Sequence, residues 1–244
     1  MGKAAKLSAR ERLREERSRA AARQRRNRTL LIIGSAVAVV AVVVGVIVAV
    51  QSGRDEQSAF AGQAPPATLQ SDGSIVMARQ GVTKPVLEVY EDFQCPACKE
   101  FETVNNGTVQ RLAAEGKVKV VYKTLAFVNP EGSLRAAGAG QCAATAGKFT
   151  EFHDVAFENQ PDERVALTLN DLKGFGEQAG ITDPAFATCV DRQKSAAQIQ
   201  AFTKQTLSDK NFRGTPTLIL DGRQLNQSEI YTVDGLTKAV TNAA

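Results

Sequence analysis

Two cysteines separated by two residues stand where a predicted strand passes into a predicted helix. The tetrapeptide is Cys95-Pro96-Ala97-Cys98; an apolar, β-branched run at residues 85–90 precedes it, and residues 99–104 favour a helix. Paired cysteines at this spacing are typical of dithiol–disulfide exchange. Free N–H groups and the positive end of the helix dipole favour a thiolate at Cys95. Because a thiolate is the species that attacks disulfides, Cys95 is the candidate nucleophile.

The same tetrapeptide could instead form half of a structural zinc site. Such sites usually need a second CxxC or a pair of histidines, whereas the other two cysteines are isolated and the chain has 1 histidine. We therefore expect no metal, and no cofactor other than a redox-active disulfide. The histidine, His153, is expected to be structural, because it lies on a predicted helix far from the CxxC pair and has no apparent partners.

The elements that would position the cysteines follow from hydrophobic periodicity and from helix-capping residues. Predicted strands cover residues 74–77, 86–90, 117–123, 217–220 and 223–225. Predicted helices cover about residues 96–115, 133–146, 150–157, 170–178, 183–207 and 233–241. Asn170 and Asp183 are the expected N-caps of two of these helices, with Pro184 at a first helical position. This order indicates a thioredoxin-like α/β fold with a helical insertion at about residues 130–210.

An uncharged apolar run at residues 30–50 predicts a membrane-spanning helix near the start of the chain. At roughly 1.5 Å per residue it would span about 31 Å, close to the thickness of a bilayer core. Residues 1–28 carry 11 Lys or Arg and 3 Asp or Glu, and the remainder carries 19 and 23, which together give the net charge of +4. Because basic flanks of a first span stay inside, the C-terminal part should lie outside the cytoplasm.

The domain prediction has four parts. Residues 1–28 form a basic cytoplasmic tail, residues 29–50 a transmembrane helix, residues 51–68 a flexible tether containing Pro65-Pro66, and residues 69–244 the folded domain. The apolar run is longer than that of a typical cleaved signal peptide, so an uncleaved anchor in the cell membrane is expected. Membrane topology also explains the arginine-rich tail more simply than nucleic-acid binding does.

The two remaining cysteines, Cys142 and Cys189, both fall in the predicted helical insertion. Four cysteines in an exported domain allow three pairings, and a Cys95–Cys98 pair leaves Cys142 to Cys189. A structural disulfide between two insertion helices is the preferred interpretation, and two buried free thiols are the alternative.

Three blocks resemble the DsbA-like thiol-disulfide oxidoreductases, in particular the membrane-anchored forms of actinobacteria. They are the active-site block at residues 90–101, the block at residues 147–154, and Arg213-Gly214-Thr215-Pro216-Thr217. The resemblance implies that Cys95 is the exposed nucleophile and Cys98 the buried resolving thiol. It also implies that Thr215 and a cis Pro216 face the disulfide and the substrate.

The resemblance further implies the partners: reduced secreted proteins as clients, and a quinone-linked membrane protein of the VKOR or DsbB type as reoxidase. The domain is expected to be a monomer, because only a tether precedes it. Two features depart from the family pattern. Ala97 stands where the best-known member has histidine, and the buried acid that many relatives carry in this strand has no obvious counterpart: Glu88 is nearby, but its place on the buried strand face is not established by the pattern.

The expected function is therefore an extracytoplasmic dithiol oxidase. A disulfide reductase or isomerase of the same fold is the first alternative, and a module for metal or cofactor maturation is the second. The long insertion favours an oxidant with a broad range of substrates.

Overall fold

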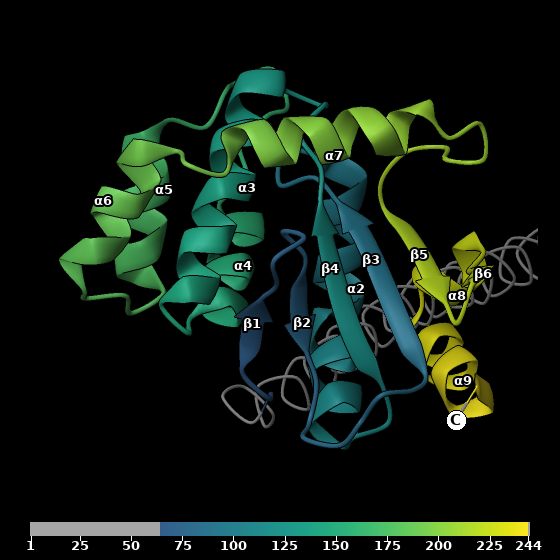
Figure 1. The fold of residues 1–244 in the computed structure, drawn as a ribbon. Coiled ribbons are helices and arrows are strands. Elements are labelled where there is room, and N and C mark those ends of the chain that lie inside the picture. Colours follow the sequence, from purple (N-terminus) through teal and green to yellow (C-terminus); the bar gives the residue numbers. More distant parts are fainter. Residues whose placement is uncertain (1–63, 244) are drawn as a thin grey trace, which may run out of the picture. The chain divides into compact units, whose positions relative to one another are not determined.

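The computed structural model of the protein describes residues 64–243 (Figure 1). The predicted basic tail, the membrane helix at 29–50 and most of the tether lie outside these described residues. Within residues 64–243, none of the helices combines the length and hydrophobicity that a membrane span requires. The end of the predicted tether forms a short strand, β1 (Ala67–Leu69), which precedes the strand that was expected to be the first.

A six-stranded mixed sheet forms the centre of the described part of the chain (Figure 1). After β1, its strands are β2 (Ile75–Met77), β3 (Val86–Glu91), β4 (Lys119–Thr124), β5 (Thr217–Leu220) and β6 (Arg223–Gln224). The spatial order is β1-β2-β4-β3-β5-β6, in which β3 and β4 are parallel and every other neighbouring pair is antiparallel. The strand that leads into the CxxC turn is thus a central one, with neighbours on both sides.

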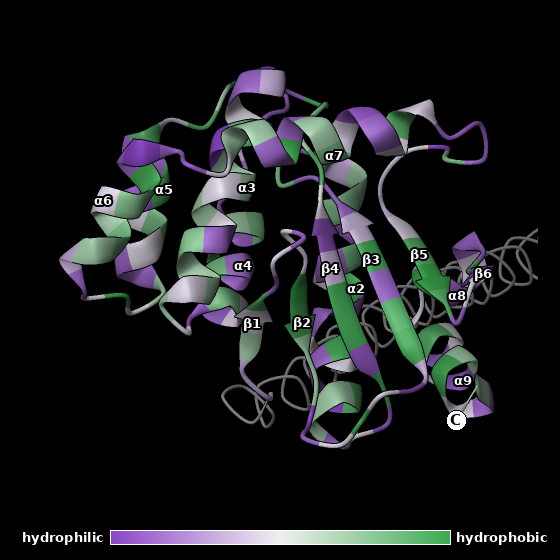
Figure 2. Cartoon of the chain, in the orientation of Figure 1, coloured by the Kyte–Doolittle hydropathy of each residue, from purple (hydrophilic) through white to green (hydrophobic). Residues whose placement is uncertain are grey.

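Strand β3 is buried on one face and half-buried on the other. Leu87 and Val89 are fully buried, and Glu91, two residues further on, continues the same face. Glu88 and Tyr90 point to the opposite face, where the Phe202 ring stacks on Tyr90 at a centroid distance of 6.4 Å. Figure 2 shows the apolar residues concentrated along β3, β4 and β5. This alternation decides which side chains of β3 point into the buried interior beneath the active site.

The helices divide into those of the thioredoxin-like part and those of the insertion. Helix α2 (Pro96–Ala114) packs against β4 and against α9 (Val233–Ala243), which follows the short α8 (Gln227–Ile230). The insertion contains α3 (Pro130–Thr145), α4 (Phe149–Glu158), α5 (Leu169–Gln178), α6 (Pro184–Arg192) and α7 (Ala196–Ser208). Figure 1 shows α3 to α6 grouped together and α7 leading back towards β5. The prediction of a thioredoxin-like fold with a helical insertion is confirmed for this part of the chain.

Two details of the insertion differ from the prediction. The single helix expected at 183–207 is two helices, because Gln193 adopts a left-handed conformation (φ 44°) that ends α6. The predicted cap Asn170 lies inside α5, whose true N-cap is Thr168: its hydroxyl accepts from the Asp171 N–H, and the Asp171 carboxylate accepts from the Thr168 N–H. The predicted cap Asp183 does accept a hydrogen bond, from the Ala185 N–H at 2.8 Å.

A disulfide joins Cys142 on α3 to Cys189 on α6, with 5.9 Å between the Cα atoms. The alternative of two free thiols therefore does not hold in this structure. The bond closes a loop with a sequence separation of 47. In the chain-entropy account, a loop of that length contributes about 4 kcal/mol to stability. The disulfide thus fixes two insertion helices to each other. Both of its cysteines are far from the CxxC turn in the sequence.

Candidate active site

The CxxC pair lies at the N-terminus of α2, as the sequence predicts. Cys95 is the N-cap residue with extended backbone, and Pro96 occupies the first turn, where its missing N–H costs no helical hydrogen bond. The Lys99 N–H donates to the Cys95 carbonyl at 3.1 Å and closes this turn. The sulfur of Cys95 therefore sits at the positive end of a helix.

Both thiols are free, and they differ in burial. Cys95 is 6% exposed and Cys98 is 0% exposed, so the expected exposed nucleophile is accessible only at its edge. Pro96 is exposed and Ala97 half-buried, so this dipeptide forms the surface beside Cys95. A disulfide partner would therefore approach over Pro96 and Ala97.

The electrostatics of the site favour a thiolate at Cys95. A hydrogen bond from the Cys98 thiol is the largest cause that lowers the pKa of Cys95, to about 6. Burial opposes this, while the Thr215 side chain and the backbone N–H groups of Cys98 and Ala97 lower the pKa further. The helix terminus thus contributes as predicted, but the partner cysteine contributes more. At neutral pH the reduced protein carries a nucleophilic sulfur at Cys95.

Cys98 has the opposite character. Its burial is the main cause that raises its pKa well above the ordinary value, and the hydrogen bond to Cys95 and the Cys95 charge raise it further. The Glu91 carboxylate adds to this effect, while the backbone of Asp92 opposes it. The pair therefore divides into one thiolate and one thiol, which is the arrangement that the resolving role of Cys98 requires.

The segment predicted to face the cysteines does lie against them. The Thr215–Pro216 peptide bond is cis, and the Cys95 thiol contacts the Thr215 carbonyl oxygen at 3.3 Å. The hydroxyl of Thr215 is buried, and beyond its interaction with the Cys95 sulfur no hydrogen bond satisfies it among the described residues. Thr215 thus presents both its carbonyl and its hydroxyl to the active sulfur.

Glutamine side chains tie the active-site loop to the insertion. Gln160, just after α4, donates to the carbonyls of Phe93 and Cys95 at 2.9 and 3.0 Å. The fully buried Gln94 donates to the Val165 carbonyl at 2.8 Å and accepts from the Leu167 N–H at 3.0 Å. The insertion therefore holds the nucleophile's own carbonyl and the two residues before it in place.

The buried acid of this strand is Glu91, not Glu88. Glu88 points to the other face of β3, where it pairs with Lys123 at 2.8 Å and its side chain is 30% exposed. Glu91 is 1% exposed, and both of its oxygens lie 3.0–3.1 Å from Nε2 of His153. Its parity with Leu87 and Val89 on a buried strand face is a sequence signal that could have identified it.

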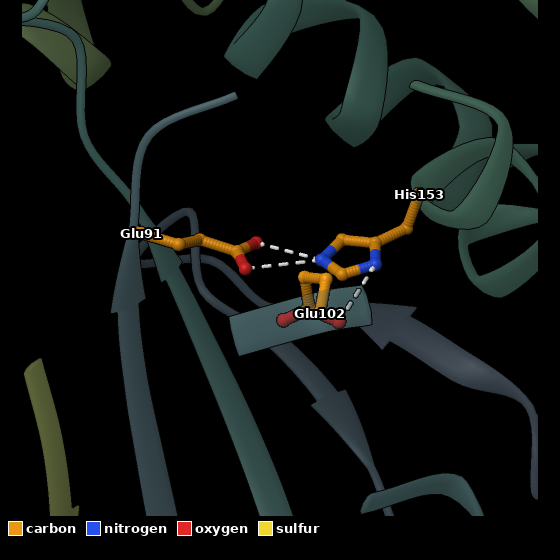
Figure 3. A group of neighbouring side chains, drawn as sticks. All are labelled: Glu91, Glu102 and His153. Carbon is orange, nitrogen blue, oxygen red and sulfur yellow. Dashed lines mark hydrogen bonds and ion pairs between the residues drawn. The ribbon is translucent and has the colours of Figure 1, made fainter. Parts of the chain in front are cut away.

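His153 is not the isolated histidine that the sequence suggested. Its Nδ1 lies 3.9 Å from Glu102, a buried residue of α2, so the ring stands between two carboxylates (Figure 3). These three side chains offer ligand atoms within 4.8 Å of one another. The two ring nitrogens face different carboxylates, however, which is the geometry of an ion-pair bridge and not of three ligands that converge on one metal ion.

Comparison with known proteins agrees with this geometry. A family model described as Thioredoxin matches residues 80–242. The chain belongs to the thioredoxin family. Within it, the oxidised DsbA structure of Mycobacterium tuberculosis is 26% identical with a TM-score of 0.54, and covers 74% of this chain and 100% of its own. The reduced DsbG structure from the same organism is 26% identical with a TM-score of 0.59, over 77% of this chain and 91% of its own.

A relative from Rickettsia prowazekii, named a protein-disulfide oxidoreductase, is 23% identical over 70% of this chain. The match spans 62% of that relative's length. The resemblance to DsbA-like members of the thioredoxin family, which the motifs indicated, is thereby confirmed.

If the Cys98 thiol is the main support of the Cys95 thiolate, Cys98→Ala should raise the pKa of Cys95 by at least about one pH unit. The measurement is the rate of alkylation of Cys95 by iodoacetamide as a function of pH, with a wild-type midpoint near 6. Cys98→Ser is the matched control, because its hydroxyl still donates a hydrogen bond, and its midpoint should rise less. A midpoint that stays at the wild-type value in Cys98→Ala would show that the helix terminus alone carries the effect.

Proposed function

We propose that this protein is a thiol–disulfide oxidoreductase that works as a dithiol oxidase outside the cytoplasm and introduces disulfides into secreted proteins. The observation that carries the proposal is the CxxC pair at the N-terminus of α2, with the Cys95 sulfur against the carbonyl of the cis Thr215–Pro216 bond and Cys98 fully buried. This environment lowers the pKa of Cys95 and so stabilises its thiolate. A stabilised thiolate favours the reduced form of the enzyme, so the Cys95–Cys98 disulfide is easily reduced and hence oxidising. Each unit by which the thiolate pKa is lowered makes the potential about 30 mV more oxidising.

The proposed reaction transfers two electrons from a client dithiol. A client thiolate attacks Sγ of Cys95 in the Cys95–Cys98 disulfide, and Cys98 leaves with the electron pair and takes up a proton. The second client thiolate then attacks the client sulfur of the mixed disulfide. Cys95 leaves as the thiolate that its surroundings stabilise, and the client disulfide is complete.

Client binding is proposed to use the cis-proline segment. Pro216 offers no N–H, and the backbone before it already contacts Cys95 through the Thr215 carbonyl. An extended client chain can pair with the backbone of this segment in the manner of an added strand. Reduced secreted proteins are thus the client class.

The cellular context is proposed from the sequence alone. Residues 29–50 anchor the protein in the cell membrane, and the tether, from residue 51 up to the start of β1, holds the monomeric catalytic domain outside. A quinone-linked membrane protein of the VKOR or DsbB type would return Cys95–Cys98 to the disulfide. This last assignment follows from the DsbA-like resemblance.

The exchange reaction is tested with stoichiometric oxidised full-length protein and a reduced, unfolded test protein that needs disulfides. Wild type should oxidise it, and Cys95→Ser, which cannot form the CxxC disulfide, should be inactive. Reduced Cys98→Ser mixed with the oxidised test protein should accumulate a mixed disulfide at Cys95, because Cys95 breaks a client disulfide and no Cys98 thiol resolves the product. Pro216→Ala should slow release of the client, so that its mixed disulfides persist longer on non-reducing gels. These results follow from the order of attack described above.

The double variant Cys142→Ala/Cys189→Ala is the control, because it removes the structural bridge and leaves the CxxC pair intact. Its folded fraction should oxidise the test protein at the wild-type rate. Oxidation that survives in Cys95→Ser, or that is lost in the control variant, would refute the assignment of the reactive pair.

The location is tested by adding protease to intact spheroplasts. The folded domain should be digested while an epitope placed before Arg28 stays protected, because the basic flank keeps that end inside. A protected C-terminal domain would contradict both the orientation and the oxidising surroundings that the proposal assumes.

A further inference from the structure

The C-terminal end of α4 is joined to the active-site turn by side-chain hydrogen bonds that run in both directions. From the insertion, Nε2 of Gln160 donates to the carbonyls of Phe93 and Cys95 at 2.9 and 3.0 Å. From α2, Nζ of Lys99 donates to the carbonyls of Glu158 and Gln160 at 3.1 and 3.3 Å. Each side chain therefore bridges two carbonyls of the other part. We call these four hydrogen bonds the clasp.

The Gln160 amide closes the turn that carries the nucleophile. Its nitrogen has two N–H donors, and the two hydrogen bonds use both of them. The Cys95 N–H already donates to the Asp92 carbonyl at 2.9 Å, and the Cys95 carbonyl also accepts from the Lys99 N–H. The peptide groups that follow Phe93 and Cys95 therefore cannot rotate without breaking a hydrogen bond to Gln160.

The position of this turn decides where the Cys95 sulfur lies. Sγ contacts the Thr215 carbonyl at 3.3 Å, and the hydrogen bond from Cys98 is the largest cause that lowers the pKa of Cys95, to about 6. The other titratable group that senses the Cys95 charge is Tyr231, between α8 and α9. Neither Cys98 nor Tyr231 belongs to the insertion. The insertion therefore acts on the sulfur through the position of the turn.

The clasp also lies beside the surface that a disulfide partner approaches. Gln160 is half-buried, and together with the exposed Pro96 and residues 161–164 it lines an open hollow of about 520 Å³. A client sulfur that reacts with Cys95 must align with Sγ at the edge of this hollow. Small displacements of a reacting atom slow such reactions strongly, so the turn has to be fixed at this point.

We propose that Gln160 is a positioning residue for thiol–disulfide exchange: through its two hydrogen bonds, the helical insertion fixes the turn that carries Cys95 and holds Sγ against its partners. Lys99 in turn holds the backbone of Gln160. This deepens the proposed function and rests on it. The Gln160 amide is uncharged, so it acts on Cys95 through geometry and not through an added charge.

The test removes the two donors and keeps the length of the side chain, as Gln160→Met. In the reduced full-length protein, the pH midpoint for alkylation of Cys95 by iodoacetamide should rise from near 6 by about half a unit to one unit, because the sulfur spends less time against its partners. The equilibrium constant for reduction of the Cys95–Cys98 disulfide by glutathione should fall by about three- to tenfold, because the thiolate is less stabilised. Gln160→Asn keeps an amide that ends one bond short of the two carbonyls. It should shift both quantities in the same direction, and it decides the matter if Gln160→Met does not fold.

Asn159→Ala is the matched control, because Asn159 is the neighbouring amide, is exposed, and donates to the Val155 carbonyl within α4. Its alkylation midpoint should equal that of wild type. A purely structural role of Gln160 would lower the melting temperature and leave the alkylation midpoint of the folded protein unchanged. A wild-type alkylation midpoint in the folded Gln160 variants, or an equal shift in Asn159→Ala, would overturn the proposal. A wild-type protein that does not oxidise the reduced test protein would instead refute the proposed function.

Discussion

A carboxylate on the buried face of the central strand is the constraint around which the active site is built. Glu91 continues the inward face of Leu87 and Val89 and so ends β3 beneath the CxxC turn, at 1% exposure. An unpaired charge there would cost several kcal/mol. The strand therefore needs a cation from elsewhere in the fold, and the insertion provides it as His153.

The same insertion also holds the active-site loop in place through hydrogen bonds. Gln160 holds the carbonyls of Phe93 and Cys95, and Gln94 reaches back to the loop after α4. The Cys142–Cys189 disulfide also links two of the insertion helices, α3 and α6, to each other. Rigid placement of this kind matters for exchange chemistry, because the Cys95 sulfur must stay aligned both with Cys98 and with the Thr215 carbonyl.

Much of this arrangement could be predicted because it is local in sequence. The CxxC pair at a strand–helix junction follows from periodicity, and so does the succession of strands and helices. The pairing of Cys142 with Cys189 is the preferred prediction once Cys95 is paired with Cys98, and the structure decides against the alternative of two free thiols. The position of the cis-proline segment beside Cys95 came from the resemblance and not from periodicity.

The remaining features depend on tertiary contacts. The partners of His153 are 62 and 51 positions away along the chain, and nothing in the local pattern of α4 points to them. The break between α6 and α7 occurs at Gln193, which adopts a left-handed backbone conformation. Because glutamine rarely adopts this conformation, the sequence does not point to a break there. At α5, Thr168 and Asn170 are both competent caps, and the Asp171 side chain decides between them. Glu91 was missed because a carboxylate at a strand end resembles a surface charge.

The central claim is that the stabilised Cys95 thiolate makes this protein an oxidant, and its reduction potential tests that claim most directly. Full-length protein is equilibrated with glutathione buffers of graded ratio, and the fraction with a Cys95–Cys98 disulfide is quantified. The account predicts a moderate oxidant, between thioredoxin at about −270 mV and DsbA at about −120 mV. A potential at or below that of thioredoxin would contradict the account and would assign the protein to the reductases.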